Sequence, residues 1–399
     1  MDIEAWWLLF LPLFFGLGWF AARAESKRQI AETKALPQSY FKSLNHLLNE
    51  EPDQAIDALI DVARVDTGTI DLYFALGNLF GQRGEIERSI RVYQSLLERA
   101  DLPDDARQMA LSKLGEAFLK GGLFDRAEES FKQLLNGPQH AHAQTQLLYI
   151  YQSQQEWAQA VEVAQGMLKT EENTVALTHF HCELAVQAMQ RKDWLVAERE
   201  LNQAQTLRPL SMRVQLLKGR WYAQQGRTDE ALAVWRQLAE TQPNSVPLLV
   251  DDAMAVFETR GEMSQGVALL YDNALKTGSF DVLNAWLNAQ AKIGSEAETL
   301  RQLNDVFIQH PSLNALDKLL SKRLAASGDE AVQGESAMIQ KLIKKQVQRL
   351  SKYRCEHCGF EAARYYWQCP ACTRWESYPP KRLEELELAQ RSRGQMNGY

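Results

Sequence analysis

A sequence pattern that returns every 33 to 38 residues constrains the fold of this 399-residue chain more than any other feature. In its best copies a glycine is followed by an aromatic residue, then by a small residue, then by a second aromatic residue. These copies occupy residues 76–93, 114–131 and 219–243. The small residues recur along the chain at Ala55, Ser89, Ala127, Ala160, Ala197, Ala231 and Val267. Such a period predicts a stack of equivalent units, each packed against its neighbours, instead of a single central core.

The repeating unit resembles the tetratricopeptide repeat (TPR), in which each copy is a pair of antiparallel helices. Small residues let the two helices approach closely, and the aromatic side chains fill the space between neighbours. We therefore predict an all-α TPR helical solenoid over residues 37–330, with about seven to nine helix pairs. The pattern fades after Phe280, so the last pairs are expected to be degenerate.

Composition and charge limit the classes of function. The chain is 45% hydrophobic and 24% charged, which is typical of a globular protein. Its net charge is -7, but residues 341–399 carry a net +6 and the rest carry -13. This balance argues against binding of nucleic acid. The sequence also lacks the phosphate-binding, dinucleotide-binding, zinc-protease and serine-hydrolase motifs, so we predict that the protein is not an enzyme.

Four of the five cysteines lie close together near the C-terminus and predict a metal site. Cys355, Cys358, Cys369 and Cys372 form two C-x2-C pairs separated by ten residues. Each C-x2-C turn aims two thiolates at one point, and Gly359 permits the tight first turn. Two such turns facing each other give a tetrahedral S4 site for zinc or a single iron. Since thiolates fill every position, we predict a closed, structural site that holds one metal ion, and we favour zinc.

The segment HFHCE, which begins at His179, has the composition of a second metal cluster. His179 and Glu183 are one helical turn apart, with Cys182 beside them. However, His181 stands where the repeat places a packed aromatic residue, so it is expected to face inward. We interpret the segment as helix packing. His357, inside the first cysteine turn, is expected to face solvent.

The N-terminal residues predict a membrane anchor. Residues 5–22 contain no charge, and 18 helical residues rise about 27 Å, close to the thickness of the bilayer hydrocarbon. Acidic residues precede this run and basic residues follow it, which predicts a periplasmic N-terminus and a cytoplasmic bulk of the chain. A cleaved signal peptide would need a basic start, which is absent. We predict a transmembrane anchor at 1–22 and a juxtamembrane linker at 23–36.

After the array we predict three further segments. Residues 331–350 form a basic helical connector, 351–380 a small rubredoxin-like or zinc-ribbon domain, and 381–399 a tail. The ribbon is expected to dock on the array, because the two carry opposite net charge and because Trp367 and Trp375 exceed what so small a core needs. Exposed charge attraction is weak, so burial of these aromatic residues should do most of the holding.

TPR solenoids bind partners along the concave surface built by the first helix of each pair. Counting from the repeat signature places six side chains on that surface: Phe74, Asn78, Glu116, Tyr149, Cys182 and Arg220. The set lacks the lysines that TPR co-chaperones use to hold a terminal carboxylate, which argues against a receptor for chaperone tails.

The order of anchor, repeat array and paired cysteines resembles the lipopolysaccharide assembly protein B family, also called LapB or YciM. The segments that carry the resemblance are residues 66–85, HFHCELA at 179–185 and the cysteine module at 353–372. The resemblance implies an inner-membrane adaptor that regulates lipopolysaccharide biosynthesis. Members are thought to bring the lipid A deacetylase to the membrane AAA+ protease FtsH, and a lipopolysaccharide-sensing inner-membrane protein restrains them. The four cysteines would bind the metal.

Two alternatives to this function stay open at the level of sequence. One is a scaffold for envelope assembly without any proteolytic role. The other is a rubredoxin-type electron-transfer protein with iron in the four-cysteine site. The absence of a partner cofactor domain and the short ten-residue spacer count against the second alternative.

Overall fold

The computed structural model describes residues 70–326 and 330–396 of the chain. The predicted anchor at 1–22, the linker and the partial repeat around Ala55 lie outside these residues. Across the described part of the chain, no helix combines the length and the apolar character needed to span a membrane.

The chain divides into two compact units, with the boundary between Gln154 and Gln155. The first unit consists of helices in which each packs on the next along the chain. Its described helices are α4 (Ile70–Arg83), α5 (Ile86–Leu97), α6 (Asp104–Lys120), α7 (Phe124–Lys132) and α8 (His140–Gln154).

The second unit continues the helical pattern and ends in the cysteine module. Its array helices are α9 (Trp157–Gln165), α10 (Glu171–Gln190), α11 (Trp194–Leu207), α12 (Met212–Gln224), α13 (Thr228–Thr241), the 3₁₀ helix η3 (Pro243–Leu248), α14 (Val250–Thr259), α15 (Met263–Thr277), α16 (Phe280–Ile293), α17 (Glu296–Gln309) and α18 (Leu313–Ala326). The predicted all-α repeat fold is therefore confirmed within the described residues.

The repeat signature works through close contact between a glycine and an aromatic ring. A side-chain carbon added at Gly77 would lie 2.4 Å from the ring of Tyr93, and one added at Gly219 would lie 2.0 Å from Trp235. Real side-chain carbons do not approach other atoms so closely, so only glycine fits at these positions. The rings of Tyr93 and Trp235 are themselves almost fully buried. This contact is why the two helices of a pair can lie so near each other.

Helices continue beyond Phe280, where the signature fades. Helix α16 buries Val282, Leu283, Trp286 and Leu287, which lie on one face at helical spacing. Trp286 is fully buried in the same hydrophobic core as the preceding repeats. The array therefore extends by apolar periodicity alone, without the small-residue signature.

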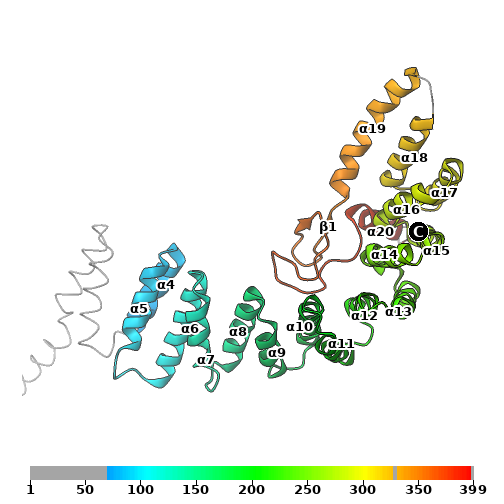
Figure 1. Ribbon diagram of the computed structural model, residues 1–399. Helices are drawn as coiled ribbons and strands as arrows, with labels where there is room; N and C mark the ends of the chain where they lie inside the picture. The colour runs from blue at the N-terminus through cyan, green and yellow to red at the C-terminus, as the bar shows by residue number, and fades with distance from the viewer. Residues whose placement is uncertain (1–69, 327–329, 397–399) are drawn as a thin grey trace, which may run out of the picture. The chain divides into compact units, whose positions relative to one another are not determined.

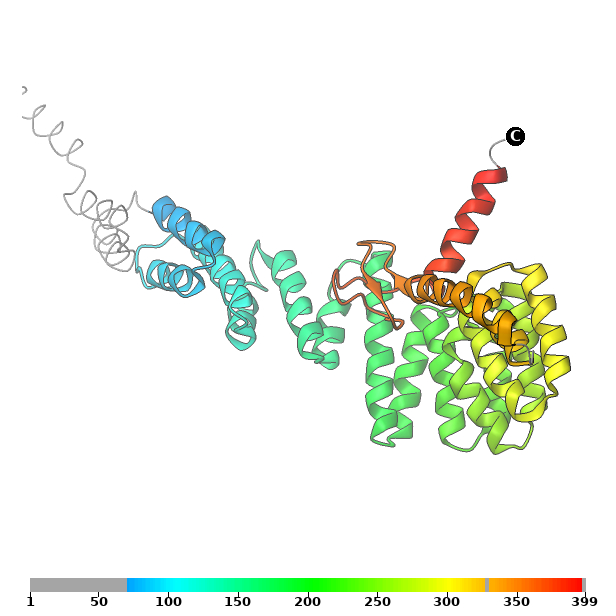
Figure 2. The same ribbon diagram turned by 90° about the horizontal axis from the view of Figure 1, so that it is seen from above.

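The segment predicted as a basic connector is helix α19 (Glu330–Leu350), which packs beside α18. It leads into strands β1 (Tyr353–Arg354) and β2 (Glu361–Ala362), which pair antiparallel with Tyr353 opposite Ala362. The residues predicted only as a tail contain a further helix, α20 (Leu383–Met396). Within the second unit the ribbon lies on the inner side of the arc of helices (Figure 1), and α20 leads away from it (Figure 2).

Candidate metal centre and its docking surface

The first cysteine pair sits on a tight turn at the end of β1. The backbone N–H of Cys355 donates to the carbonyl of Phe360 at 2.9 Å, and the N–H of Gly359 donates back to the carbonyl of Cys355 at 2.9 Å. Gly359 has a φ of 77°, in the left-handed region that glycine adopts without strain. The turn therefore places Cys355 and Cys358 on the same side of the backbone.

The second cysteine pair repeats this turn. The N–H of Cys369 donates to the carbonyl of Arg374, and the N–H of Thr373 donates to the carbonyl of Cys369, both at 2.9 Å. Thr373 takes the left-handed conformation that glycine takes in the first turn, with a φ of 57°. Nothing in the sequence marks this equivalence, because threonine carries no signal for a left-handed residue.

The four sulfur atoms meet at one point between the two turns. Cys355 Sγ lies 3.8 Å from Cys372 Sγ, and Cys358 Sγ lies 3.7 Å from Cys369 Sγ. All four sulfurs lie within 4.8 Å of one another. Sulfurs bound to one tetrahedral zinc at about 2.3 Å would be about 3.8 Å apart. The four cysteines are therefore clustered to hold one metal ion, as the sequence predicts.

The sulfurs differ in how readily they ionise. Burial opposes ionisation of Cys355, but hydrogen bonds from Ser377 and from the backbone N–H groups of Cys358 and His357 outweigh it and lower the pKa of Cys355 to about 6. Burial and the crowding of neighbouring sulfurs raise the pKa of Cys372 to about 12. Four thiolates therefore require a cation between them, which a divalent metal would supply. The ring of His357 faces solvent, as predicted, and lies 3.1 Å from Arg374.

The ribbon docks on the array through its tryptophans. Trp375 stacks on His179 of α10, with ring centroids 4.5 Å apart and planes 14° apart. The same ring meets Trp157 and Phe180 edge-on at 6.3 and 6.0 Å. Trp367 also contacts His179, at a centroid distance of 5.9 Å. The expectation that spare aromatic residues dock the ribbon on the array is therefore confirmed.

A chain of polar contacts surrounds this stack. Arg213 Nη1 donates to His179 Nδ1 at 2.9 Å, so the ring proton of His179 is on Nε2, which donates to Glu376 Oε1 at 3.1 Å. Glu376 also accepts from Arg208 at 2.7 Å, and Arg213 pairs with Glu183 at 2.6 Å. Burial lowers the pKa of His179 to about 4. Burial opposes ionisation of Glu376, but hydrogen bonds from His179 and Arg208 outweigh it and lower its pKa to about 2.

The HFHCE segment is thus the surface that receives the ribbon. His181 faces inward as predicted, with its Nδ1 2.8 Å from Glu200. The placement of Cys182 in the partner groove is wrong, because its side chain is fully buried in the hydrophobic core. Among the described residues, the four-cysteine cluster is the only group of His, Cys, Asp and Glu side chains arranged to hold a metal ion.

A second anchoring point joins the module to α16. Arg382 binds Asp281 through two hydrogen bonds of 2.8 Å each. Asp281 also accepts a hydrogen bond of 2.7 Å from the hydroxyl of Tyr353, and the guanidinium of Arg382 lies 3.9 Å from the centre of the Tyr353 ring. Arg382 further donates to the backbone carbonyls of Ser351 and Ala363. Arg382 therefore fixes both ends of the ribbon to one carboxylate of the array.

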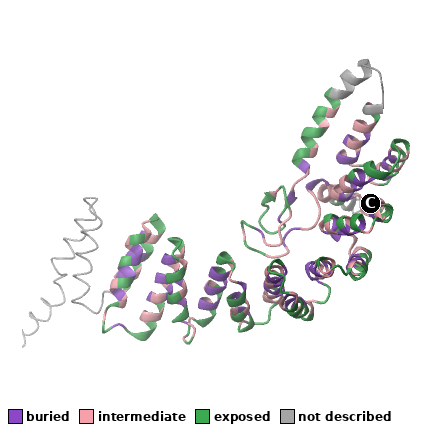
Figure 3. Ribbon diagram, in the orientation of Figure 1, coloured by how far each residue is buried: buried purple, intermediate pink, exposed green. Residues whose placement is uncertain are grey.

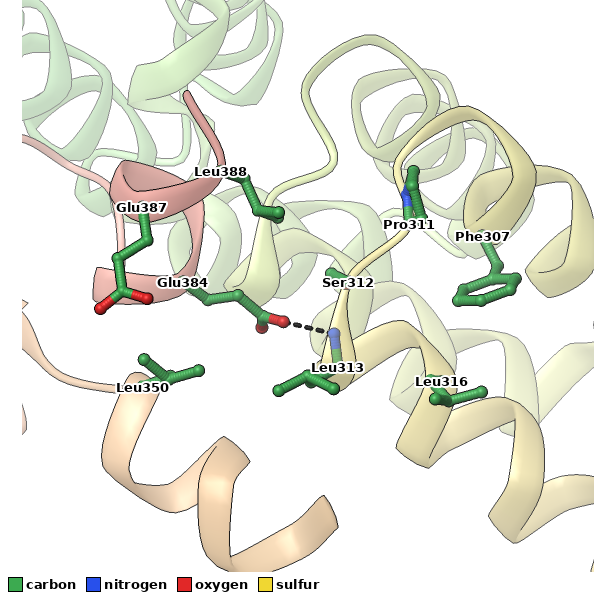
Figure 4. Close-up of a pocket in the computed structure, with 9 residues that line it drawn as sticks. All are labelled: Phe307, Pro311, Ser312, Leu313, Leu316, Leu350, Glu384, Glu387 and Leu388. Atoms are coloured by element: carbon green, nitrogen blue, oxygen red, sulfur yellow. Dashed lines mark hydrogen bonds between the residues drawn. The ribbon is translucent and has the colours of Figure 1, made fainter. Parts of the chain in front are cut away.

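Two consecutive glutamates of α20 cap two helices of the array. Glu384 accepts hydrogen bonds from the backbone N–H groups of Leu313 and Asn314 at the start of α18, and Figure 4 shows the bond from Leu313. Glu385 accepts from the N–H of Phe280 at the start of α16, at 3.0 Å. The first N–H groups of a helix lack partners within the helix and favour negative charge. The capping groups here come from a distant part of the chain, which local sequence signals cannot reveal.

The ion pairs between the module and the array run in both senses. At Glu376 the acid belongs to the ribbon and the bases to the array, the reverse of what the net charges suggest. Two other pairs run in the predicted sense, from a base of the module to an acid of the array: Arg374 lies 3.4 Å from Glu172, and Arg382 lies 2.8 Å from Asp281. These ion pairs stand beside the tryptophan contacts that dock the ribbon.

The predicted groove residues fall in both units. Phe74 lies 6.2 Å from Tyr93, and Asn78 accepts a hydrogen bond from the Tyr93 hydroxyl. Glu116 contacts Lys113 at 2.9 Å and His142 at 3.4 Å, and Tyr149 is 45% exposed. These four predicted residues belong to the first unit. Arg220 belongs to the second unit and pairs with Asp252 of α14 at 2.6 Å. Their role in binding a partner stays a prediction.

Comparison with known proteins places the chain in a family. Residues 353–379 match the family described as Rubredoxin metal binding domain, and residues 74–141 and 182–246 match the Tetratricopeptide repeat. A crystal structure of MamA protein is 21% identical and covers 45% of this chain and 94% of that chain, with a TM-score of 0.30. That score is too low to support an argument from the structure.

The curated relatives match almost the whole chain. Lipopolysaccharide assembly protein B of Escherichia coli (strain K12) is 30% identical over 382 residues, which are 94% of this chain and 97% of that protein. The protein of the same name from Haemophilus influenzae is 24% identical over 389 residues, or 94% and 98% of the two chains. The similarity thus runs along nearly the whole of both chains, and the chain belongs to the lipopolysaccharide assembly protein B family.

Proposed function

We propose that this protein is an inner-membrane adaptor that regulates lipopolysaccharide biosynthesis by promoting degradation of the lipid A deacetylase by the protease FtsH. The observation that carries the proposal is the 30% identity to a lipopolysaccharide assembly protein over 94% of the chain. A repeat array supports it physically, because a solenoid offers extended surfaces on which two proteins can bind at once.

The metal centre supports a structural role over a catalytic one. The four cysteines supply every ligand of a tetrahedral ion, so no position is left for a substrate or an activated water. When bound, the ion would neutralise the thiolates and fix the two turns. We propose zinc, because the part of the chain that the structure describes holds no second cluster of metal-binding side chains that could give an iron centre an electron-transfer partner. Visible absorbance of the purified protein would instead indicate iron.

The proposed partners are FtsH, the deacetylase and a lipopolysaccharide-sensing inner-membrane protein, together with the bilayer through residues 5–22. In this proposal the N-terminus is periplasmic and the array and ribbon are cytoplasmic. An anchor confines the adaptor to the same surface as a membrane-embedded protease, which raises their effective concentration without any new contact.

The test measures the half-life of the deacetylase in cells that lack the chain, carry it, or carry it without residues 1–22 at matched expression. The full chain should shorten the half-life, and the truncated chain should not. An unchanged half-life together with recovery of envelope enzymes by crosslinking would instead support a scaffold without a proteolytic role. Full activity of the truncated chain would refute the proposed need for an anchor.

A further inference from the structure

Helix α19 exposes apolar side chains to solvent. Met338, Ile339 and Leu342 have 71%, 56% and 62% of their surface exposed. The helix packs on α18 with its other side, where Gln340 donates a hydrogen bond to Ser321 and Leu350 is buried. Most of the described part of α19 is green in Figure 3. The apolar residues are therefore held in place on a fixed helix and are not covered by the described residues.

The same helix carries concentrated positive charge. No aspartate or glutamate occurs between residues 336 and 355, although six lysines and arginines do. Four of these bases lie on α19, are exposed, and take part in none of the ion pairs found among the described residues: Lys341, Lys344, Lys345 and Arg349. An unpaired cluster of this kind attracts negative charge from outside the chain.

The apolar and basic residues share one side of the helix. Met338, Leu342, Lys345 and Arg349 follow one another at steps of four, three and four residues, so they form a single stripe. Lys341 lies immediately beside this stripe. Lysines next to apolar residues can place their stems along an apolar surface while their ammonium groups stay in water.

We propose that α19 lies on the surface of an anionic lipid bilayer, with Met338 and Leu342 turned toward the acyl chains and the lysines bound to lipid phosphates. Basic amphipathic helices bind membranes in this way, by apolar burial together with attraction to anionic headgroups. A protein partner fits less well, since protein interfaces favour arginine and aromatic anchors over lysine. The exposed side of α19 from residue 338 onward has three lysines against one arginine, and no aromatic residue.

This inference does not depend on the proposed adaptor function. It adds a second membrane contact near the C-terminal end of the array, separate from the predicted anchor. Held at two points, the protein would present the array at a fixed orientation to a partner in the same membrane.

The test uses the full chain in lipid nanodiscs, with a photo-crosslinking residue introduced as Leu342→p-benzoylphenylalanine. The control places the same residue at Leu195, which is 80% exposed on α11. The predicted anchor holds both proteins at the disc, so only local contact with lipid can differ. With equimolar phosphatidylglycerol and phosphatidylcholine, lipid adducts at position 342 should exceed those at position 195 by roughly tenfold.

The charge dependence is tested with K341E/K344E/K345E in the Leu342 variant. These three exposed lysines have no partner among the described ion pairs, so the fold should be retained, as circular dichroism would verify. With these charge reversals, lipid adducts at position 342 should fall to the level seen at position 195. The unreversed protein should show the same fall in discs of phosphatidylcholine alone and at high salt. The matched control K169E/R191E/K192E reverses three exposed bases elsewhere on the array and should leave the adducts unchanged.

Three results would overturn the proposal. Equal adduct yields at positions 342 and 195 would show that α19 does not touch the bilayer. Equal yields with and without anionic lipid would show that charge does not recruit it. Crosslinking of position 342 to a protein instead of lipid in whole cells would identify an acidic protein surface as the occupant.

Discussion

His179 and Trp375 lie face to face, with ring centroids 4.5 Å apart, although one belongs to the repeat array and the other to the metal ribbon. Trp375 follows the predicted ligand Cys372 by three residues, so the ring stands beside the second cysteine turn. His179 is fully buried beneath it. This contact joins the metal ribbon directly to α10.

Replacing Trp375 by alanine should release the ribbon from α10. The variant loses the stack on His179 and the edge contacts to Trp157 and Phe180, a loss of about 3 kcal/mol for a large aromatic side chain. Hydrogen exchange of α10 should rise while the metal content stays constant. Phe360→Ala is the matched control, because it removes an aromatic ring that is 43% exposed in the same ribbon. Unchanged exchange in the Trp375 variant would show that the stack does not hold the module.

Removing the metal should unfold the ribbon and leave the array folded. Cys355→Ser leaves three thiolates, and structural zinc supplies about 10–16 kcal/mol of folding free energy in small metal peptides. Each array helix packs mainly on its neighbours, so the helical signal in circular dichroism should persist. A metal assay on the same samples should show loss of the ion. Full metal content, or collapse of the whole helical signal, would contradict this prediction.

Asp281→Asn should weaken docking at the second anchoring point. The substitution leaves Arg382 without its charged partner in a partly buried site, which typically costs about 1.5–3 kcal/mol. Glu361→Gln is the comparison, since it removes an exposed carboxylate paired with Arg354, and such pairs are worth about 0–1 kcal/mol. Thermal unfolding of both variants provides the measurement. If the Asp281 variant lost no more stability than the Glu361 variant, the Asp281 carboxylate would have no central role in docking.

Docking of the ribbon should weaken in acid through His179. The pKa of His179 is about 4 in the docked protein against an ordinary 6.5, so the undocked state binds more protons between these values. The stability that His179 contributes is therefore complete above pH 6.5 and is lost as the pH falls through 4. The equilibrium constant for docking should change by at most about tenfold per pH unit. Glu376, with a pKa of about 2, adds a further loss below 4.5.

The variant His179→Gln separates this effect from simple loss of contact. Its amide can still donate to Glu376 but does not titrate, so docking should be weaker at every pH and should no longer show the weakening in acid that His179 causes between pH 6.5 and 4.5. Tryptophan fluorescence or hydrogen exchange across this range would measure both proteins. If docking changed equally with pH in the wild-type protein and in the His179 variant, the pH dependence would belong to another group.

Glu385 should have the opposite pH dependence. Burial raises its pKa to about 7 from 4.5, against hydrogen bonds from the N–H groups of Phe280 and Arg382. Because the folded state binds more protons between these values, this stability is complete below pH 4.5 and is lost as the pH rises through 7. Glu385→Gln should therefore stabilise the protein at pH 8 and have little effect at pH 5. The control Glu387→Gln, on the same helix, should leave the stability unchanged at pH 5 and at pH 8. A loss of stability at pH 8 in the Glu385 variant would refute this assignment.

The sequence alone determined the repeat fold and the metal site. Both depend on contacts between residues near each other in the chain, such as Gly77 with Tyr93 or the two turns of four cysteines. Local spacing encodes such contacts directly, because a helix pair or a C-x2-C turn leaves few alternative geometries. The alternatives of zinc and iron stayed open because both ions accept the same four thiolates.

Only the tertiary structure decided how these parts are joined. The sequence drew attention to His179 and predicted that Trp375 would be buried, but nothing in either segment identified the other as its partner. Asp281 with Arg382, and Glu384 with the start of α18, carry no local signal at all. Such contacts depend on where the arc of the array brings distant residues together, which follows from the summed geometry of many helices and not from any single motif.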